Sequence, residues 1–159
     1  AVMRAWYDIV SMELDKRADE AGLRASMAEL DLLIARERDR GVPVSRIILA
    51  GFSQGGAVVL AHLLRQTIPV AGVMALSSYL PLGGKNAEEI TEAAKGIPVF
   101  MAHGSFDPVV PIGLGEYSRR QLQQFGLQVQ FKSYPMQHNV CPDEIRAMGD
   151  WLSERFATR

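Results

Sequence analysis

Apolar residues recur at two different spacings along this chain, and the two spacings alternate. Between 23 and 40 they recur every three or four positions, which predicts an amphipathic helix that ends at Gly41. A short, continuous apolar run at 46–50 then predicts a strand, and 54–66 returns to helix-like sequence. The pattern therefore predicts a strand that passes almost directly into a helix.

The rest of the chain continues this alternation. Two nearly continuous apolar runs, 70–78 and 97–104, are typical of central strands that helices cover on both faces. The segment 129–135 alternates apolar and polar residues, as a strand near a sheet edge does. The remaining predicted elements are helices at 116–125 and 143–156 and a loop-rich or short helical insert at 81–94. This order predicts an α/β fold with a mostly parallel sheet and helices on both faces.

Length and composition limit the number of domains and the classes of partner. The chain has 159 residues, of which 48% are apolar, and it contains no repeat, so we expect one domain over 1–159. Lys and Arg number 17 against 18 for Asp and Glu, and these charges are scattered. Neither nucleic acid nor a charged membrane surface is therefore an expected partner.

Cysteine content and the first residues bear on location. Cys141 is the single cysteine of the sequence, which excludes an intramolecular disulfide and a multi-cysteine metal site and favours the cytoplasm. The first ten residues have no signal-peptide pattern, and no apolar run is long enough for a transmembrane helix. We expect no membrane-spanning segment and no metal or other cofactor.

The junction between the strand at 46–50 and the following helix carries the candidate nucleophile. Its sequence is Gly51-Phe52-Ser53-Gln54-Gly55, the G-x-S-x-G pattern, which by itself also occurs in glycine-rich connectors. In a tight strand-to-helix turn the Ser53 hydroxyl would project toward a substrate carbonyl. The backbone N–H of Gln54, at the start of the helix, is then a candidate oxyanion donor.

A serine nucleophile needs a base, and the sequence offers three histidines. His62 falls inside the helix that follows Ser53, so it reads as a packed helix residue. His103 lies at a strand end, where a packing or hydrogen-bonding role is the stronger interpretation. His138 lies in a loop beyond the carboxyl end of the last strand, where parallel sheets build their sites, and is the predicted base.

Asp107 is the predicted acid that orients the base. It follows the strand at 97–104, although the Ser-Phe-Asp-Pro context would also suit an Asp that merely caps a turn. Ser53, Asp107 and His138 thus follow three strands in the order nucleophile, acid, base. Cys141 has no supporting turn chemistry for a rival nucleophile, and Asp143 with Glu144 fit the first turn of the last helix.

Four segments together resemble the small carboxylesterases and acyl-protein thioesterases of the α/β-hydrolase superfamily. They are RIILAGFSQGGAVVL, ALSSYLPL, HGSFDPVVP and YPMQHNVCPDEIRAMGDWL. The resemblance implies the same triad, Ser53, Asp107 and His138, and hydrolysis of short- to medium-chain esters or thioesters through an acyl-enzyme without a cofactor. The Trp6-Tyr7 pair also resembles a stretch that follows the family's early strands.

Two features depart from the family pattern. Gln137-His138-Asn139 stands where relatives have Gly-His, which changes the turn before the base. Relatives also carry early strands and a His-Gly-Leu-Gly type loop with a second oxyanion donor, and no such loop precedes Ala1 in this sequence. We therefore expect an N-terminally shortened α/β-hydrolase fold whose strand at 46–50 is an exposed edge, which favours homo-oligomers or aggregation.

Two functional hypotheses follow. The first is a serine hydrolase acting on a small ester or thioester, an acylated protein or a lysophospholipid. The second is an inactive or weakly active hydrolase-fold fragment that serves as a binding or assembly module. Sequence does not decide the acyl-chain length, which depends on the shape of the pocket.

Overall fold

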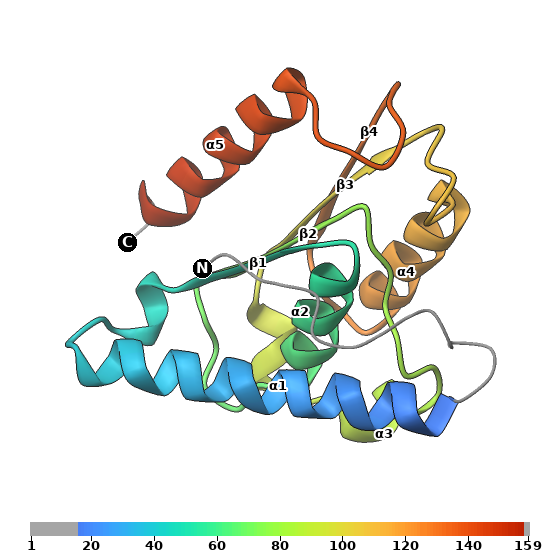
Figure 1. Ribbon diagram of the computed structural model, residues 1–159. Coiled ribbons are helices and arrows are strands. Elements are labelled where there is room, and N and C mark those ends of the chain that lie inside the picture. Colours follow the sequence, from blue (N-terminus) through green and yellow to red (C-terminus); the bar gives the residue numbers. More distant parts are fainter. Residues whose placement is uncertain (1–15, 158–159) are drawn as a thin grey trace.

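The computed structural model describes residues 16–157 and shows one sheet with helices on both faces (Figure 1). The strands are β1 (Ile48–Phe52), β2 (Gly72–Leu76), β3 (Val99–Gly104) and β4 (Val129–Tyr134). The helices are α1 (Lys16–Asp39), α2 (Gln54–Leu64), α3 (Lys85–Glu89), α4 (Ile112–Gln124) and α5 (Pro142–Ala157), with 3₁₀ turns η1 (Val44–Arg46) and η2 (Ala93–Gly96). The prediction of an α/β fold is confirmed.

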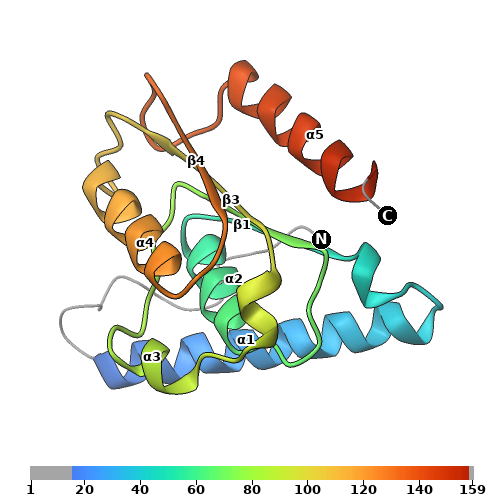
Figure 2. The ribbon, with the colours of Figure 1, turned by 180° about the vertical axis from the view of Figure 1, so that it is seen from behind.

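The four strands are parallel and lie in the order β1-β2-β3-β4. A parallel sheet that grows in one direction by right-handed crossovers places its connecting helices on one face. Helices α2 and α4 accordingly lie on one face together with α1, while α5, which follows the last strand, covers the other (Figures 1 and 2). As predicted, β2 and β3 are central and β4 is an edge strand.

Alternate residues of the central strands supply two separate cores. Val73 and Ala75 of β2 pack into the larger core with α1 and α2, whereas Met74 faces α5. On the α5 side, the rings of Phe100 and Trp151 lie 5.8 Å apart between centroids. All five residues of β2 are buried, which is why its sequence reads as one continuous apolar run.

Several boundaries differ from the predicted ones. β1 extends to Phe52, which pairs with Leu76 of β2, so the strand runs into the Gly-x-Ser-x-Gly turn instead of ending at 50. Helix α4 begins at Ile112, not at 116. The sequence predicts a later start because the glycines in the first turn have low helix propensity. Helix α1 begins at Lys16, where the apolar spacing that predicts a helix from 23 has not yet begun.

The insert after β2 contains both a helix and a turn. The short helix α3 and the 3₁₀ turn η2 fall within or next to the segment predicted as loop-rich or partly helical. None of the helices between residues 16 and 157 has the length and apolar content needed to cross a membrane. The resemblance drawn from Trp6 and Tyr7 lies outside the described residues.

Candidate active site

Ser53 occupies the turn between β1 and α2 in a conformation that L-residues rarely adopt. Its φ is 57° and its ψ is −115°, so the turn stores strain of about 1–3 kcal/mol. The Ser53 N–H donates to the Leu76 carbonyl (2.8 Å), and the Ser53 carbonyl accepts the first bond of α2, from the Ala57 N–H (3.1 Å). The sheet and the helix thus hold the strained residue from both sides.

The glycines of this motif are explained by close approach of the backbone. A Cβ at Gly51 would lie 2.3 Å from the carbonyl carbon and oxygen of Gly55, closer than any side-chain carbon tolerates. The strand can therefore turn directly into the helix only if residue 51 has no side chain. This steric requirement is the reason that the sequence motif marks a sharp turn.

His138 meets the serine from the loop between β4 and α5. Its Nε2 lies 3.0 Å from Ser53 Oγ, and its Nδ1 lies 2.7 Å from Asp107 Oδ2. A carboxylate accepts hydrogen bonds, so Nδ1 donates to Asp107 and the Nε2 lone pair faces the serine hydroxyl. This tautomer is the one in which the imidazole can take the serine proton.

Asp107 is buried and accepts three hydrogen bonds. Its Oδ1 receives the backbone N–H groups of Val109 (2.8 Å) and Val110 (2.9 Å), and its Oδ2 receives His138. Burial raises the pKa of Asp107, but the bonds from His138 and from the two N–H groups outweigh it and lower the pKa below its ordinary value. Asp107 therefore both caps its turn and presents an anion to His138.

The structure thus brings together the three side chains that the sequence singles out. They form one hydrogen-bonded row from the Asp107 carboxylate through the His138 imidazole to the Ser53 hydroxyl. Gln54 is the first residue of α2, so its N–H has no acceptor within the helix. The row has the chemical elements of nucleophilic acyl transfer: a hydroxyl, a base, an orienting anion and a candidate oxyanion donor.

The other two histidines lie elsewhere and have partners of their own. His62 is buried in α2, where its Nε2 lies 2.7 Å from Asp31 Oδ1 of α1. His103 is buried at the end of β3, and its Nε2 donates to the Val110 carbonyl (2.7 Å). Both are hydrogen-bonded packing residues, as the sequence interpretation favours.

Three other polar residues lie close to His138 in the sequence and differ in their burial and contacts. Cys141 is a partly buried free thiol. Asp143 is exposed in the first turn of α5, as predicted, and pairs with Arg146. Glu144, in the same turn, is fully buried, and this burial raises its pKa.

Apolar side chains stand exposed next to each member of the row. Phe52 precedes Ser53, and its ring centroid lies 4.8 Å from that of His138. Phe106 and Val109 flank Asp107, and Val140 lies two positions after His138. Such a surface suits contact with the hydrocarbon part of a ligand.

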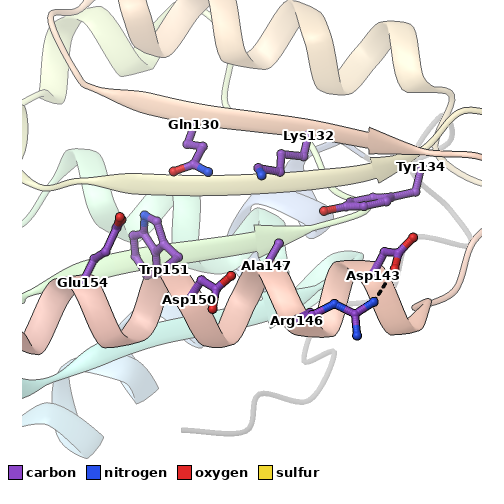
Figure 3. A pocket seen from close by; sticks show the side chains of 9 residues that line it. All are labelled: Gln130, Lys132, Tyr134, Asp143, Arg146, Ala147, Asp150, Trp151 and Glu154. Atoms are coloured by element: carbon purple, nitrogen blue, oxygen red, sulfur yellow. Dashed lines mark hydrogen bonds and ion pairs between the residues drawn. The ribbon is translucent and has the colours of Figure 1, made fainter.

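A groove of about 510 Å³ lies between β4 and α5, away from the row (Figure 3). Side chains of β4, including Lys132, and of α5, including Arg146 and Trp151, line it, but none of the three candidate catalytic side chains does. Between residues 16 and 157 no group of three or more His, Cys, Asp or Glu side chains is arranged to hold a metal ion.

Comparison with known proteins shows the family of this chain. Residues 1–155 match the phospholipase/carboxylesterase family. The chain belongs to that family. It is 44% identical over 162 residues to acyl-protein thioesterase 1 of Neurospora crassa, an alignment that covers 97% of this chain and 66% of the relative.

Solved structures place this family member in the α/β-hydrolase fold. The crystal structure of Arabidopsis thaliana SOBER1 is 27% identical, with a TM-score of 0.82 over 87% of this chain and 66% of that one. Zea mays acyl-protein thioesterase 2 is 26% identical, with a TM-score of 0.80 over 95% and 72%. The chain spans about two thirds of the length of these relatives. The predicted resemblance is confirmed. The family to which the chain belongs is one of carboxylesterase and thioesterase hydrolases, as the resemblance implies.

One residue of this family member at the turn was not singled out by sequence reasoning. Ser78 follows β2, and its Oγ donates to the Ser53 carbonyl (2.8 Å). The sequence signal that could have indicated this role is the position of Ser78 just beyond the carboxyl end of β2, which lies next to β1, the strand that carries the nucleophile. A serine there reads from sequence as an ordinary loop residue.

Proposed function

We propose that the protein is a serine hydrolase in which Ser53 is the nucleophile, His138 the general base, Asp107 the orienting acid and the Gln54 N–H an oxyanion donor. The observation that carries the proposal is the continuous row of hydrogen bonds from Asp107 through His138 to Ser53. Family membership supports the same assignment.

In the first half of the reaction, Ser53 Oγ attacks the carbonyl carbon of the substrate while His138 Nε2 takes the hydroxyl proton. The carbonyl oxygen becomes an oxyanion, toward which the Gln54 N–H and the positive end of α2 are directed. His138 then gives its proton to the departing alcohol or thiol. The acyl group remains as an ester on Ser53.

In the second half, water replaces the leaving group. His138 accepts a proton from the water, and the resulting hydroxide attacks the acyl carbon. The tetrahedral species collapses with transfer of the proton from His138 back to Ser53 Oγ, and a carboxylic acid leaves. Asp107 stays ionised throughout, because its lowered pKa reflects bonds that are kept when the imidazole becomes charged.

The substrate class follows from the surroundings of the row. The exposed apolar side chains beside the triad, such as Phe52 and Phe106, suit an acyl chain. Relatives are named acyl-protein thioesterases, so S-acylated protein is the substrate that we favour over a small ester or a lysophospholipid. A location in the cytoplasm, favoured by the single cysteine, and a homo-oligomer stay predictions.

The test is covalent labelling followed by turnover. A fluorophosphonate probe should label the wild-type protein and not Ser53→Ala, while Ser45→Ala, at an exposed serine before β1, should label normally. Turnover is then compared for an S-acyl peptide, a p-nitrophenyl ester and a lysophospholipid with the same acyl chain. Labelling that persists in Ser53→Ala would contradict the assignment.

A wild-type protein that takes no label and hydrolyses none of the three substrates would favour the alternative, a hydrolase-fold binding or assembly module. Faster turnover of the free lysophospholipid than of the S-acyl peptide would contradict the preferred substrate alone. The two outcomes are separable because the first concerns the nucleophile and the second only the choice of acyl carrier.

A further inference from the structure

Ser78 is a completely buried serine whose side chain bonds to the backbone of the candidate nucleophile. It lies two positions beyond the end of β2, is 0% exposed, and its Oγ donates to the Ser53 carbonyl oxygen at 2.8 Å. The same oxygen also accepts the Ala57 N–H at 3.1 Å. The Ser53 carbonyl is therefore held by one bond from the helix and one from the sheet side.

The helix leaves a space for this contact. A Cβ on Gly56 would lie 2.5 Å from Ser78 Cβ and 2.6 Å from Ser78 Oγ. Only glycine at 56 allows the Ser78 side chain to stand between the strand end and the helix. The second glycine of the Gln54-Gly55-Gly56 sequence thus has a steric role that differs from that of Gly51.

The bonded carbonyl shares a peptide plane with the candidate oxyanion donor. The plane contains the Ser53 C=O and the Gln54 N–H, which point in opposite directions because the peptide is trans. The orientation of this plane is set by the ψ of Ser53, which is −115° in a residue with a strained φ of 57°. A bond that fixes the oxygen therefore fixes the direction of the N–H.

From this arrangement we propose that Ser78 is a positioning residue for the oxyanion site. Its hydroxyl holds the Ser53–Gln54 peptide so that the Gln54 N–H faces the position of the oxyanion. The hydrogen bond also polarises the amide, which strengthens the N–H as a donor. This inference rests on the proposed function, and because Ser78 is fully buried it acts through the peptide and not on the substrate.

The competing interpretation is that Ser78 only stabilises the turn. A structural role would lower the melting temperature and weaken all ligands alike. A positioning role would weaken only species that carry negative charge on the carbonyl oxygen. A pair of ligands that differ in this charge separates the two interpretations.

The experiment compares Ser78→Ala with Ser77→Ala. Ser77 is adjacent and also fully buried, and its Oγ has no partner among the described residues. Ser77→Ala therefore removes a buried hydroxyl without removing a hydrogen bond, and it serves as the control. For each variant we would measure kcat and KM for a p-nitrophenyl ester. We would also measure inhibition by an alkyl trifluoromethyl ketone, which forms a hemiketal oxyanion on the serine, and by the corresponding alcohol, which does not.

For Ser78→Ala we expect kcat to fall and the ketone to bind more weakly by the same factor, about tenfold, which is less than the roughly 10²–10³-fold effect of deleting a whole oxyanion donor. Inhibition by the alcohol should not change, and Ser77→Ala should behave as wild type. Equal weakening of ketone and alcohol, or no weakening of the ketone, would overturn the inference.

If Ser78→Ala does not fold, Ser78→Cys replaces it, because a thiol keeps the shape but donates a weaker hydrogen bond. The same selective loss for the ketone is expected, by a smaller factor, and a variant with unchanged ketone binding would overturn the inference. A wild-type protein that neither hydrolyses the ester nor binds the ketone would instead refute the proposed function, and the positioning role with it.

Discussion

Ser53 Oγ lies 3.0 Å from His138 Nε2, although the two residues are 85 positions apart in the sequence. Ser53 follows β1 and His138 follows β4, so the contact joins the loops of the two outer strands of the described sheet. Asp107 reaches the same point from the end of β3. Parallel strands bring their carboxyl ends to one edge, and this is how distant segments converge on one site.

Removal of either the nucleophile or the base should abolish ester hydrolysis. For Ser53→Ala and for His138→Ala we expect kcat to fall on the order of 10³-fold or more, and the double variant to be no worse, because the two groups act as a unit. The measurement is turnover of a p-nitrophenyl ester by each single variant and by the pair. Losses that multiply in the double variant would show that the two residues act independently.

The Asp107→Asn variant tests the orienting anion. An amide at this position can still accept the N–H groups of Val109 and Val110, so the loop should keep its shape. The amide nitrogen cannot accept the proton of His138 Nδ1, so we expect kcat to fall on the order of 10³–10⁴-fold with a nearly unchanged melting temperature. A variant that keeps wild-type turnover would argue against Asp107 as the acid.

His103 should affect stability more than chemistry. Its imidazole is buried and donates to the Val110 carbonyl, while Asp107 Oδ2 lies 3.7 Å away, beyond hydrogen-bond distance. His103→Ala leaves a cavity and an unpaired carbonyl, which should cost about 2–4 kcal/mol of unfolding free energy. Urea denaturation measures this loss. A loss of turnover as large as that of His138→Ala in a folded protein would contradict the structural role.

Sequence patterns were sufficient for the elements that carry the row. Continuous apolar runs identify β2 and β3 as central strands, and the glycines around Ser53 identify the turn, because close backbone approach permits no other residue at Gly51. His138 and Asp107 could be chosen because both follow strands that have a clear pattern. Position in a parallel sheet thus gives the candidate site before any distance is known.

Contacts between side chains distant in the sequence could not be predicted in this way. The bond from Ser78 to the Ser53 carbonyl depends on which strand lies beside β1, and no local pattern encodes it. The burial of Glu144 is likewise invisible, since an acidic residue in a first helical turn normally faces solvent. Both depend on how neighbouring elements pack.

A cluster of charges joins α1, α3 and the residue that caps the C-terminus of α2, and it should make the stability of the protein depend on pH in the acid range. Glu89 accepts both terminal nitrogens of Arg24 (3.0 Å each) and Nε of Arg65 (2.6 Å). The bonds from Arg24 and then from Arg65 lower the pKa of Glu89 from 4.5 to about 2. A carboxyl whose pKa is lower in the folded than in the unfolded protein stabilises the fold at pH values above its unfolded pKa. This contribution is lost as the pH falls through the folded pKa.

The Glu89→Gln variant isolates this contribution. Its melting temperature should lie below that of wild type at pH 7, and the difference should shrink as the pH falls from 4.5 toward 2. Glu88→Gln, at an exposed position on the same short helix, is the control and should show no such trend. A difference between wild type and Glu89→Gln that stays constant with pH would contradict the ion-pair account.

Glu144 should have the opposite effect on the pH dependence of stability. Its carboxyl is fully buried at the start of α5, neither carboxylate oxygen has a hydrogen-bond partner among the described residues, and burial raises its pKa above 4.5. A carboxyl whose pKa is higher in the folded than in the unfolded protein contributes stability that is fully present at pH values below its unfolded pKa. This contribution is lost as the pH rises through the folded pKa. At alkaline pH the protein must therefore either ionise a buried acid or hold its proton at a cost.

The Glu144→Gln variant removes that cost, because a neutral amide of similar shape cannot ionise. We expect the variant to gain melting temperature relative to wild type as the pH rises above 4.5, where the carboxyl of the unfolded chain ionises. Asp143→Asn is the matched control, since Asp143 is exposed one position earlier in the same helical turn. Thermal unfolding of the three proteins across this range gives the comparison. A gain for Glu144→Gln that is independent of pH, or one matched by Asp143→Asn, would mean that the burial of the acid does not govern the pH dependence.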